Sequence, residues 1–196
     1  MYYNTMGKGK LIVISAPSGT GKSTIIGELM KDESLKLEFS ISATTRPPRG
    51  SEQHGVEYYF LSLDDFRQRI NNDEFAEYHE VYEGRYYGTL KSEIKRITNK
   101  GNNVVLDLDV LGGVDVKKMY GKKALALFIQ PPSVEILRQR LLSRGTDSIE
   151  DINNRVDRAK YELSFADQYD CCVVNDVLED AIAQAREIIT NFIKSK

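Results

Sequence analysis

The sequence predicts an α/β fold in which helices cover both faces of a parallel β-sheet. Four short apolar runs indicate its strands: Leu11–Ser15, Val104–Leu108, Ala124–Ile129 and Cys171–Val174. The runs are nearly continuous and do not alternate with polar residues, which is typical of strands that are buried on both faces. Helical patterns separate the runs, and this alternation favours a parallel sheet with right-handed crossovers.

The segments between these runs supply the helical layers. Helices are predicted over Lys22–Lys31, Val134–Ser143 and Glu150–Phe165. Another helix is predicted near the C-terminus, because five apolar residues recur there at the spacing of one buried helix face. These residues are Leu178, Ile182, Ala185, Ile189 and Phe192.

Two segments interrupt the alternation of strand and helix. Residues 39–89 contain short extended stretches rich in tyrosine and a hairpin-like segment that turns near Glu83–Gly84, which predicts a small, partly antiparallel insertion. Residues 138–158 form a second, polar insertion rich in arginine. With 196 residues, the chain is long enough for one stable core to which both insertions are appended.

Composition excludes several classes of protein. Apolar residues make up 41% and charged residues 29% of the chain, which is ordinary for a soluble globular protein and excludes a disordered one. No run approaches the roughly 18 apolar residues of a membrane span. The first ten residues, MYYNTMGKGK, lack the apolar segment of a secretory signal, so a cytoplasmic protein without a membrane partner is expected.

Charge and cysteine content argue against nucleic-acid binding, a disulfide and a zinc site. The net charge of −2 lacks the basic surplus of a DNA- or RNA-binding protein. Cys171 and Cys172 are adjacent on a predicted strand, so they point to opposite faces and are poorly placed to form a disulfide. With only His54 and His79 besides, no zinc-binding spacing occurs. Composition leaves a monomer and a homodimer both open.

A phosphate-binding turn follows the first predicted strand. Residues 16–23 read A-P-S-G-T-G-K-S, which matches the P-loop pattern G-x-x-x-x-G-K-[ST] except that Ala16 replaces the first glycine. In such a turn successive N–H groups point at phosphate oxygens, and the following helix adds its positive N-terminal end. Lys22 is expected to reach the β- and γ-phosphates, and the Ser23 hydroxyl to ligate magnesium. Alanine is tolerable at position 16 if φ is not positive there.

The second apolar run ends in the sequence Leu-Asp-Leu-Asp. P-loop enzymes use a carboxylate at such a strand end to orient water bound to magnesium, which is the role expected for Asp107. A solvent-facing strand end is the alternative, and the P-loop upstream favours the role at the metal.

The first insertion carries a candidate site for a second anion. Arg46 and Arg49 are three residues apart and are separated by two prolines, which predicts a stiff pair suited to a dianionic phosphate. Tyr58 and Tyr87 can donate phenol hydroxyls to the same phosphate. Half-buried sheet residues are the alternative interpretation of these tyrosines.

Eight motifs occur in order along nearly the whole chain, and together they resemble the guanylate kinase family. They are SAPSGTGKST, FSISATTRPPRGSE, HGVEYYF, EFAEY, RYYGT, VVLDLD, PPSVEILRQRLLSRGT and VVND. The resemblance implies transfer of the γ-phosphoryl group of ATP to GMP, with dGMP as a further acceptor, in purine nucleotide metabolism and with Mg²⁺. It also implies a three-layer P-loop core (8–37, 90–137 and 160–196), a mixed-sheet GMP-binding lobe (38–89) and a helical lid (138–159).

The resemblance further implies a role for individual residues. The catalytic residues would be Lys22, Arg46 and the lid arginines Arg140, Arg144 and Arg155. ATP would contact Ala16, Pro17, Ser18, Gly19, Thr20, Gly21, Lys22, Ser23, Thr24 and Asn175. GMP would contact Arg46, Arg49, Tyr58 and Tyr87 through its phosphate, Ser42 and Glu77 through its base, and Glu52, Thr89 and Asp109 alongside. Magnesium would be held by Ser23 and, through water, by Asp107.

The two contacts that the resemblance implies for the base, with Ser42 and Glu77, suit guanine. Guanine offers an O6 acceptor to the Ser42 hydroxyl, and N1–H and N2–H donors to the Glu77 carboxylate. Adenine reverses both polarities and would leave buried groups unpaired, at about 1–3 kcal/mol each. The attacking phosphate oxygen is already ionised, so no catalytic histidine is expected.

Two departures from the family pattern limit this transfer of roles. The family often has Gln-Gly after the Asp-x-Asp strand, where this chain has Val110-Leu111-Gly112-Gly113, so Leu111 receives no role. The hairpin near Glu83 is about one residue longer than the family pattern, which leaves Tyr86 and Tyr87 as alternatives for the phosphate contact.

Two other functions share parts of this sequence pattern with a kinase. A guanylate kinase-like scaffold module binds a peptide and has no need of an intact P-loop or of the Arg46/Arg49 pair. A GTP-dependent switch reads guanine with an Asn-Lys-x-Asp loop, which this sequence lacks. Both motif comparisons favour the kinase.

Overall fold

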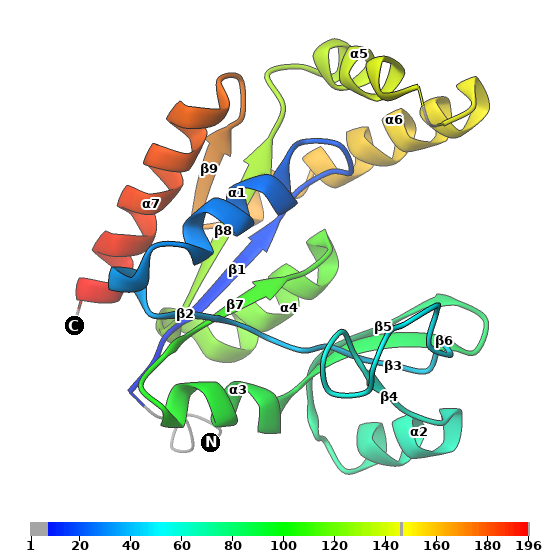
Figure 1. The fold of residues 1–196 in the computed structure, drawn as a ribbon, viewed down its shortest axis with the longest axis vertical. Coiled ribbons are helices and arrows are strands. Elements are labelled where there is room, and N and C mark those ends of the chain that lie inside the picture. Colours follow the sequence, from blue (N-terminus) through cyan, green and yellow to red (C-terminus); the bar gives the residue numbers. More distant parts are fainter. Residues whose placement is uncertain (1–7, 146, 196) are drawn as a thin grey trace.

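The computed structural model describes residues 8–145 and 147–195, and a parallel sheet forms its centre (Figure 1). The five strands of this sheet lie in the order β2-β7-β1-β8-β9, and every neighbouring pair is parallel. They are β1 (Leu11–Ser15), β2 (Leu37–Phe39), β7 (Asn103–Asp107), β8 (Ala124–Gln130) and β9 (Cys171–Val174). The predicted fold class is therefore confirmed.

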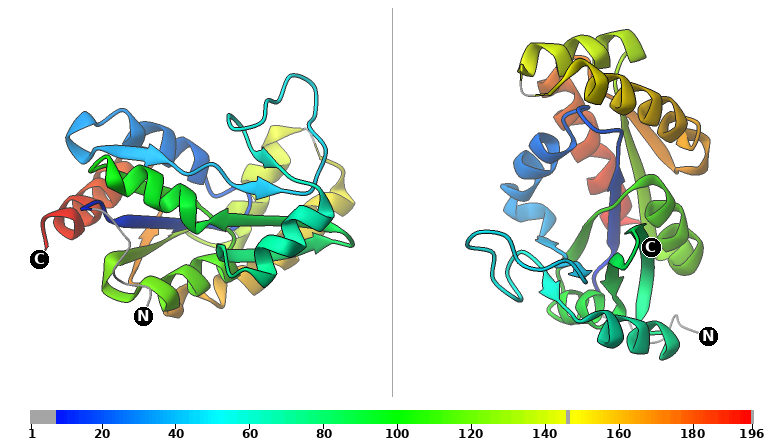
Figure 2. Two further views of the ribbon diagram at one scale, coloured as in Figure 1. Left: turned by 90° about the horizontal axis from the view of Figure 1, so that it is seen from below. Right: turned by 90° about the vertical axis from the view of Figure 1, so that its right-hand side faces the viewer.

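Helices cover both faces of the sheet, as Figure 2 shows. The described helices are α1 (Lys22–Met30), α2 (Leu63–Asn71), α3 (Lys91–Asn99), α4 (Val110–Tyr120), α5 (Val134–Arg144), α6 (Ile149–Leu163) and α7 (Leu178–Lys194). Alternate residues of β1 serve opposite faces: Ile12 and Ile14 pack with α1 and α7, and Leu11 and Val13 pack with α3 and α4. This double burial is the reason that β1 is continuously apolar from Leu11 to Ile14.

A second sheet forms a lobe beside the core. Its strands lie in the order β4-β3-β6-β5, with β3 and β4 parallel and the other pairs antiparallel. They are β3 (Ala43–Thr44), β4 (Tyr59–Phe60), β5 (Phe75–Tyr82) and β6 (Arg85–Leu90). A small apolar cluster packs α2 against this sheet, with the rings of Phe66 and Phe75 stacked 4.3 Å apart. The predicted, partly antiparallel insertion is thus confirmed.

Helices α5 and α6 lie side by side and form a pair that projects from one end of the molecule (Figure 1). Their contact is an apolar cluster of their own: Leu137, Leu141, Ile152, Val156 and Ala159. The cluster is separate from the core of the sheet, so the pair can keep its shape if it moves as a unit. Serine caps the start of each helix, because Ser133 and Ser148 accept hydrogen bonds from backbone N–H groups three residues on.

Most predicted elements agree with the observed ones to within two residues, and three differences have clear causes. The core sheet includes β2, which continues to Phe39, two residues into the segment assigned to the lobe. Strand β9 is not buried on both faces, because it is the last strand of the sheet and Cys172 and Val174 are exposed there. Helices α2, α3 and α4 were not predicted, and α4 contains Gly112 and Gly113, which weaken helix propensity.

The expectations about membrane spans and the N-terminus concern different parts of the chain. Within the described residues, no helix is long and apolar enough to cross a membrane. Residues 1–7 of the N-terminal stretch, for which no secretory signal is expected, lie outside the described residues.

A buried carboxylate joins the lobe to the core. Glu93 of α3 is only 2% exposed, and it accepts hydrogen bonds from the Ile41 backbone N–H (3.2 Å) and the Tyr59 hydroxyl (3.0 Å). Arg96 pairs with it at 2.7 Å. Burial alone would raise the pKa of Glu93, but hydrogen bonds from Arg96, Ile41 and Tyr59 outweigh it and hold that pKa below its usual value.

Replacement of Glu93 by alanine is expected to lower the free energy of unfolding by about 2–4 kcal/mol, because it leaves the Ile41 N–H and the Tyr59 hydroxyl without their acceptor, at about 1–3 kcal/mol each. Urea denaturation monitored by circular dichroism measures this loss. Glu28→Ala is the matched control, since Glu28 pairs with Lys31 at the surface and such a pair contributes about 0–1 kcal/mol. Equal losses in both variants would show that Glu93 does not anchor the lobe.

Candidate active site

The P-loop sequence forms a turn between β1 and α1, at the C-terminal edge of the parallel sheet. Gly19 and Gly21 both have φ of +91°, the left-handed region that favours glycine. A Cβ atom on Gly21 would also stand only 2.5 Å from Nδ2 of Asn175. Ala16 is not among the described residues with positive φ, so its replacement of the first glycine carries no backbone strain, as predicted.

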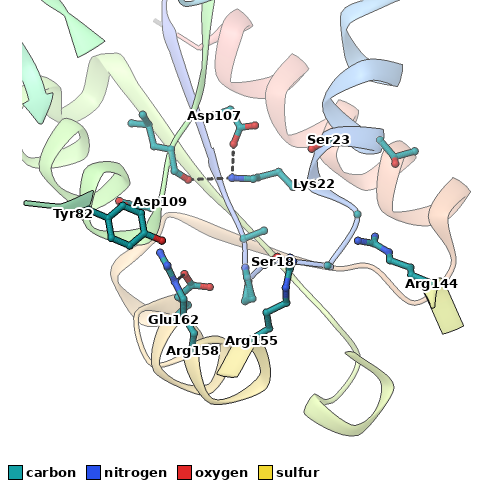
Figure 3. Close-up of a pocket in the computed structure, with 16 residues that line it drawn as sticks. Ser18, Lys22, Ser23, Tyr82, Asp107, Asp109, Arg144, Arg155, Arg158 and Glu162 are labelled. Carbon is teal, nitrogen blue, oxygen red and sulfur yellow. Dashed lines mark hydrogen bonds and ion pairs between the residues drawn. The ribbon is translucent and has the colours of Figure 1, made fainter. Parts of the chain in front are cut away.

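This turn lines a cavity of about 790 Å³, shown in Figure 3. The cavity lies between the P-loop, the end of β7 and helix α6. Its lining residues are Ala16, Pro17, Ser18, Gly19, Gly21, Lys22, Ser23, Thr24, Tyr82, Asp107, Leu108, Asp109, Arg144, Arg155, Arg158 and Glu162. Most residues predicted to contact ATP are therefore brought together around one space.

Lys22 lies across the end of β7. Its ammonium forms an ion pair with the Asp107 carboxylate and donates a hydrogen bond to the Leu108 carbonyl at 3.2 Å (Figure 3). Both charged side chains remain partly exposed, at 19% and 28%. A phosphate bound in the turn can therefore draw the ammonium away and free the carboxylate.

The three predicted lid arginines do not share one environment. Arg155 donates to the Ser18 hydroxyl at 2.9 Å, and Arg144 lines the same cavity (Figure 3). Arg140 instead donates to the carbonyls of Asn175 (2.8 Å) and Asp176 (3.1 Å). It therefore ties α5 to the loop after β9 and does not line the large cavity.

A neighbouring pocket of about 310 Å³ lies on the outer side of the P-loop. Arg140, Asn175 and Thr20 line it, and the Asn175 amide donates to the Thr20 carbonyl at 2.6 Å. Asn175 is buried, with 6% of its surface exposed. The amide thus fixes the P-loop to the end of the last strand.

A second cavity, of about 140 Å³, lies on the lobe side. Its lining residues are Ser42, Tyr58, Glu77, His79, Val81, Tyr87, Gly88, Asp107, Leu108 and Asp109. Asp107, Leu108 and Asp109 line the large cavity as well. The two cavities therefore meet at the end of β7, with the P-loop on one side and the predicted base-binding residues on the other.

Neither Arg46 nor Arg49 is among the described residues that line the lobe-side cavity, and only Arg46 contacts a residue that does. Arg46 is 5% exposed, and its guanidinium bonds both oxygens of Glu52, at 2.7 and 3.0 Å. Its guanidinium carbon lies 5.1 Å from the centre of the Tyr58 ring. Hydrogen bonds to Glu52 and then Tyr87 raise the pKa of Arg46 despite its burial, so this residue carries a positive charge at any accessible pH.

Glu52 holds both arginines of the pair. Besides bonding Arg46, it accepts a hydrogen bond from the Arg49 backbone N–H at 2.8 Å. The Arg46 hydrogen bond lowers the pKa of Glu52 to about 2. The Arg49 side chain is exposed. Glu52 thus faces the arginines, and its predicted contact with GMP stays a prediction.

The geometry of the lobe shows which of Tyr86 and Tyr87 lines the cavity. Tyr87 lines the cavity and contacts Arg46, whereas Tyr86 packs against Phe66 at 5.3 Å in the apolar cluster of the lobe. Adjacent residues of a strand point to opposite faces, so only one of them can reach the cavity. That residue is Tyr87.

Glu77 is the buried acidic group of this cavity. It is 8% exposed, and the Thr89 hydroxyl donates to its Oε1 at 2.6 Å. Burial raises the pKa of Glu77 to about 7, although the Thr89 hydrogen bond and the proximity of His79 oppose this rise. Thr89 is fully buried and does not line the cavity, so it positions Glu77.

Asp109 has two structural roles. It caps α4, accepting a hydrogen bond from the Gly112 N–H at 2.8 Å, and it lines both cavities. Its negative charge adds to the rise in the pKa of Glu77.

Sequence reasoning missed four residues with polar or charged side chains that line the cavities: His79, Tyr82, Arg158 and Glu162. Two of them had a usable signal. His79 follows Glu77 by two residues on a strand, which puts both on one face, and Arg158 follows Arg155 by three residues on a helix. Tyr82 and Glu162 reach the cavity through the placement of the hairpin and the lid, which no local pattern encodes.

The donor set around the P-loop fits magnesium. Ser23 and Asp107 offer a hydroxyl and a carboxylate to the large cavity, and both are hard oxygen donors. Within the described residues, no group of three or more His, Cys, Asp or Glu side chains could hold a metal ion. Mg²⁺ usually keeps several waters and binds through one or two side chains plus substrate phosphates, so two oxygen donors on the protein are compatible with it.

Comparison with known proteins gives one consistent family. The family model described as guanylate kinase matches residues 8–192. The guanylate kinase of Bacteroides thetaiotaomicron is 57% identical over 188 residues, covering 96% of this chain and 92% of that protein. The guanylate kinase of Porphyromonas gingivalis is also 57% identical, covering 94% of this chain and 98% of that protein. The crystal structure of guanylate kinase from Anaplasma phagocytophilum superposes with a TM-score of 0.72 at 28% identity, covering 96% of this chain and 88% of that one.

Proposed function

The chain belongs to the guanylate kinase family, and we propose that its two adjoining cavities hold the two nucleotides of that reaction. The enzyme transfers the γ-phosphoryl group of ATP to GMP and so forms ADP and GDP. The observation that carries the site assignment is the shared wall of Asp107, Leu108 and Asp109, on which a donor and an acceptor phosphate can meet. We propose dGMP as a further acceptor.

ATP is assigned to the large cavity and the pocket beside it. Main-chain N–H groups of the P-loop bind the phosphates, and Lys22 leaves Asp107 to reach the β- and γ-phosphates. The adenine is assigned to the pocket of Asn175 and Thr20. Arg144 and Arg155 line the phosphate side of the cavity, where their charges are placed to neutralise the transferring group. Arg140 is assigned to the same task once the lid closes.

GMP is assigned to the lobe-side cavity. Its phosphate is assigned to Arg46, Arg49, Tyr58 and Tyr87, and its guanine edge to Ser42 and Glu77. Both tyrosines, Ser42 and Glu77 line the cavity, and Arg46 lies against the Tyr58 ring. The remaining three residues of the predicted set act around these contacts: Glu52 orients the arginines, Thr89 orients Glu77, and Asp109 lies at the junction of the cavities.

Magnesium is assigned to Ser23, with Asp107 acting through water. When bound, the metal neutralises charge on the phosphates of ATP. The release of Asp107 from Lys22 on ATP binding makes that carboxylate available for this role.

Catalysis in this arrangement comes from positioning and from charge neutralisation. The GMP phosphate is ionised and needs no general base, so Lys22 and the arginines supply the main protein contribution. The lobe (38–89) and the lid (138–159) flank the cavities, and their closure on the core excludes water and protects ATP from hydrolysis. We further propose that the enzyme works in the cytoplasm, as a monomer or a homodimer and without DNA or RNA.

Steady-state turnover with four acceptors tests this function. With ATP and Mg²⁺, kcat/KM for GMP is expected to exceed that for AMP, UMP and CMP by at least about 10³-fold, because the wrong base leaves Glu77 and Ser42 unpaired. A coupled assay of ADP release measures the rates. Preference for another acceptor would overturn the base assignment, and absence of turnover with all four would favour a binding module. Addition of GMP alone should also raise Tm, since a ligand that binds the folded state stabilises it.

A further inference from the structure

One histidine in the lobe-side cavity has no role in the assignments above. His79 follows Glu77 by two residues on β5, and both side chains line the cavity. Its Nε2 atom is buried and has no hydrogen-bond partner among the described residues. A buried polar atom without a partner is costly, and such an atom in a binding cavity points to a contact made in another state.

The unpartnered nitrogen lies between two carboxylates. Nε2 of His79 is 4.0 Å from Oε2 of Glu77 and 3.7 Å from Oδ2 of Asp115, just beyond hydrogen-bond distance in both directions. Thr89 donates to Oε1 of Glu77, so Oε2 is the oxygen that faces the imidazole. Asp115 lies on α4, and its side chain is 51% exposed, so this carboxylate is the more solvated of the two.

Other charged groups near this cluster are mostly acidic. Asp109, at the start of α4, adds negative charge near Glu77. Tyr87 of β6 lies opposite His79 in the sheet, and Lys118 of α4 lines a surface groove together with Glu77 and Asp115. A protonated imidazole at His79 would therefore offset the repulsion that Asp109 imposes on an ionised Glu77.

The hydrogen-bonding capacity of Glu77 has room for this partner. An ionised carboxylate accepts about four hydrogen bonds, two at each oxygen. Oε1 can accept from Thr89 and from one N–H of guanine, and Oε2 can accept from the other N–H of guanine and from His79. A protonated carboxyl cannot accept in all four directions.

We propose that His79 is a positioning residue for guanine recognition, whose protonated ring donates Nε2–H to Oε2 of Glu77 and keeps that carboxylate ionised while the base binds. Asp115, the more solvated carboxylate, stabilises the charged ring as well. The proposal rests on the proposed function, because it needs Glu77 to bind guanine. It assigns no proton transfer to His79.

The pH dependence of the KM for GMP tests the proposal. Since burial places the pKa of Glu77 near 7 and guanine requires the ionised form, KM for GMP should rise as the pH falls through that range. In His79→Gln the rise should begin about one pH unit higher, so that KM near neutral pH is about 5- to 10-fold above wild type. Asp115→Asn should shift the profile in the same direction by less. The kcat at saturating GMP and the KM for ATP should stay within about twofold in both variants.

Two further variants make the outcomes distinguishable. Glu77→Gln should raise the KM for GMP and remove its pH dependence, and a normal KM in this variant would overturn the role of Glu77 and hence the site assignment. If Glu77→Gln behaves as expected but the profile of His79→Gln coincides with wild type, only the role of His79 is overturned. A His79→Gln variant that loses kcat and ATP affinity equally would also overturn it, because that pattern indicates a structural defect. His54→Gln, at the other histidine and outside both cavities, is the control.

Discussion

Replacing Lys22 by methionine is expected to lower kcat by about 10²–10³-fold, because it removes a preorganised positive charge from the transferring phosphoryl group. Methionine keeps most of the apolar stem, so the P-loop should retain its conformation. The change also leaves Asp107 without its ion-pair partner, which adds uncompensated negative charge beside the phosphates. Steady-state kinetics at saturating GMP and varied ATP measure kcat and the KM for ATP.

The same helix supplies a control for this variant. Lys31, just after the end of α1, forms an exposed ion pair with Glu28, and Lys31→Met removes an equal charge far from the cavity. Its kcat should stay within about twofold of wild type. If Lys22→Met retains most of its activity, or if both variants lose activity equally, the P-loop lysine does not act on the phosphates as described. An unchanged Tm in both variants would show that a loss of kcat does not come from unfolding.

The strands of the core could be predicted because burial on both faces leaves a local trace in the sequence. β1 and β9 have the predicted bounds, and the helices that follow them begin where predicted. β2 left no such trace, because it is a three-residue edge strand with Glu38 at its centre. What places it in the sheet is its pairing with β7, more than sixty residues away, and local patterns do not encode such a contact.

The motifs of the site could also be predicted, but the partners of each side chain could not. The P-loop is a local turn whose glycines and lysine are fixed by spacing, so residues 16–24 were found together. The position of Arg140 depends on where the lid stands relative to Asn175, which is a long-range property. The same holds for Glu52, whose side chain pairs with Arg46.

His79 of the lobe-side cavity had a local signal in the sequence, but it received no role in the predicted site. The expectation that no catalytic histidine is needed came from the ionised state of the acceptor phosphate, and that argument concerns proton transfer alone. It gave no reason to ask what keeps a buried Glu77 ionised. The alternation of β5 places His79 on the same face as Glu77, so the question could have been asked from the sequence.

Replacing Arg46 by alanine is expected to lower kcat/KM for GMP by about 10²–10³-fold, because it removes a preorganised positive charge from the phosphate of GMP. The guanidinium is buried against Tyr58 and bonds Glu52 through two nitrogens. Without it, the phosphate of GMP loses a donor and meets the unpaired carboxylate of Glu52. Arg46→Lys should rescue little of the activity, since an ammonium cannot bond both oxygens of Glu52 in the same plane.

The double variant Arg46→Ala/Glu52→Ala separates these two effects. Removal of the carboxylate relieves its repulsion of the phosphate, so the double variant should recover about tenfold in kcat/KM relative to Arg46→Ala. Arg69→Ala is the control, because Arg69 belongs to α2 of the same lobe and pairs with Glu74 at the surface. A double variant that is less active than Arg46→Ala would mean that Glu52 contacts GMP directly and does not merely orient the arginine. Near-normal kcat/KM in Arg46→Ala would instead remove the arginine pair from the acceptor site.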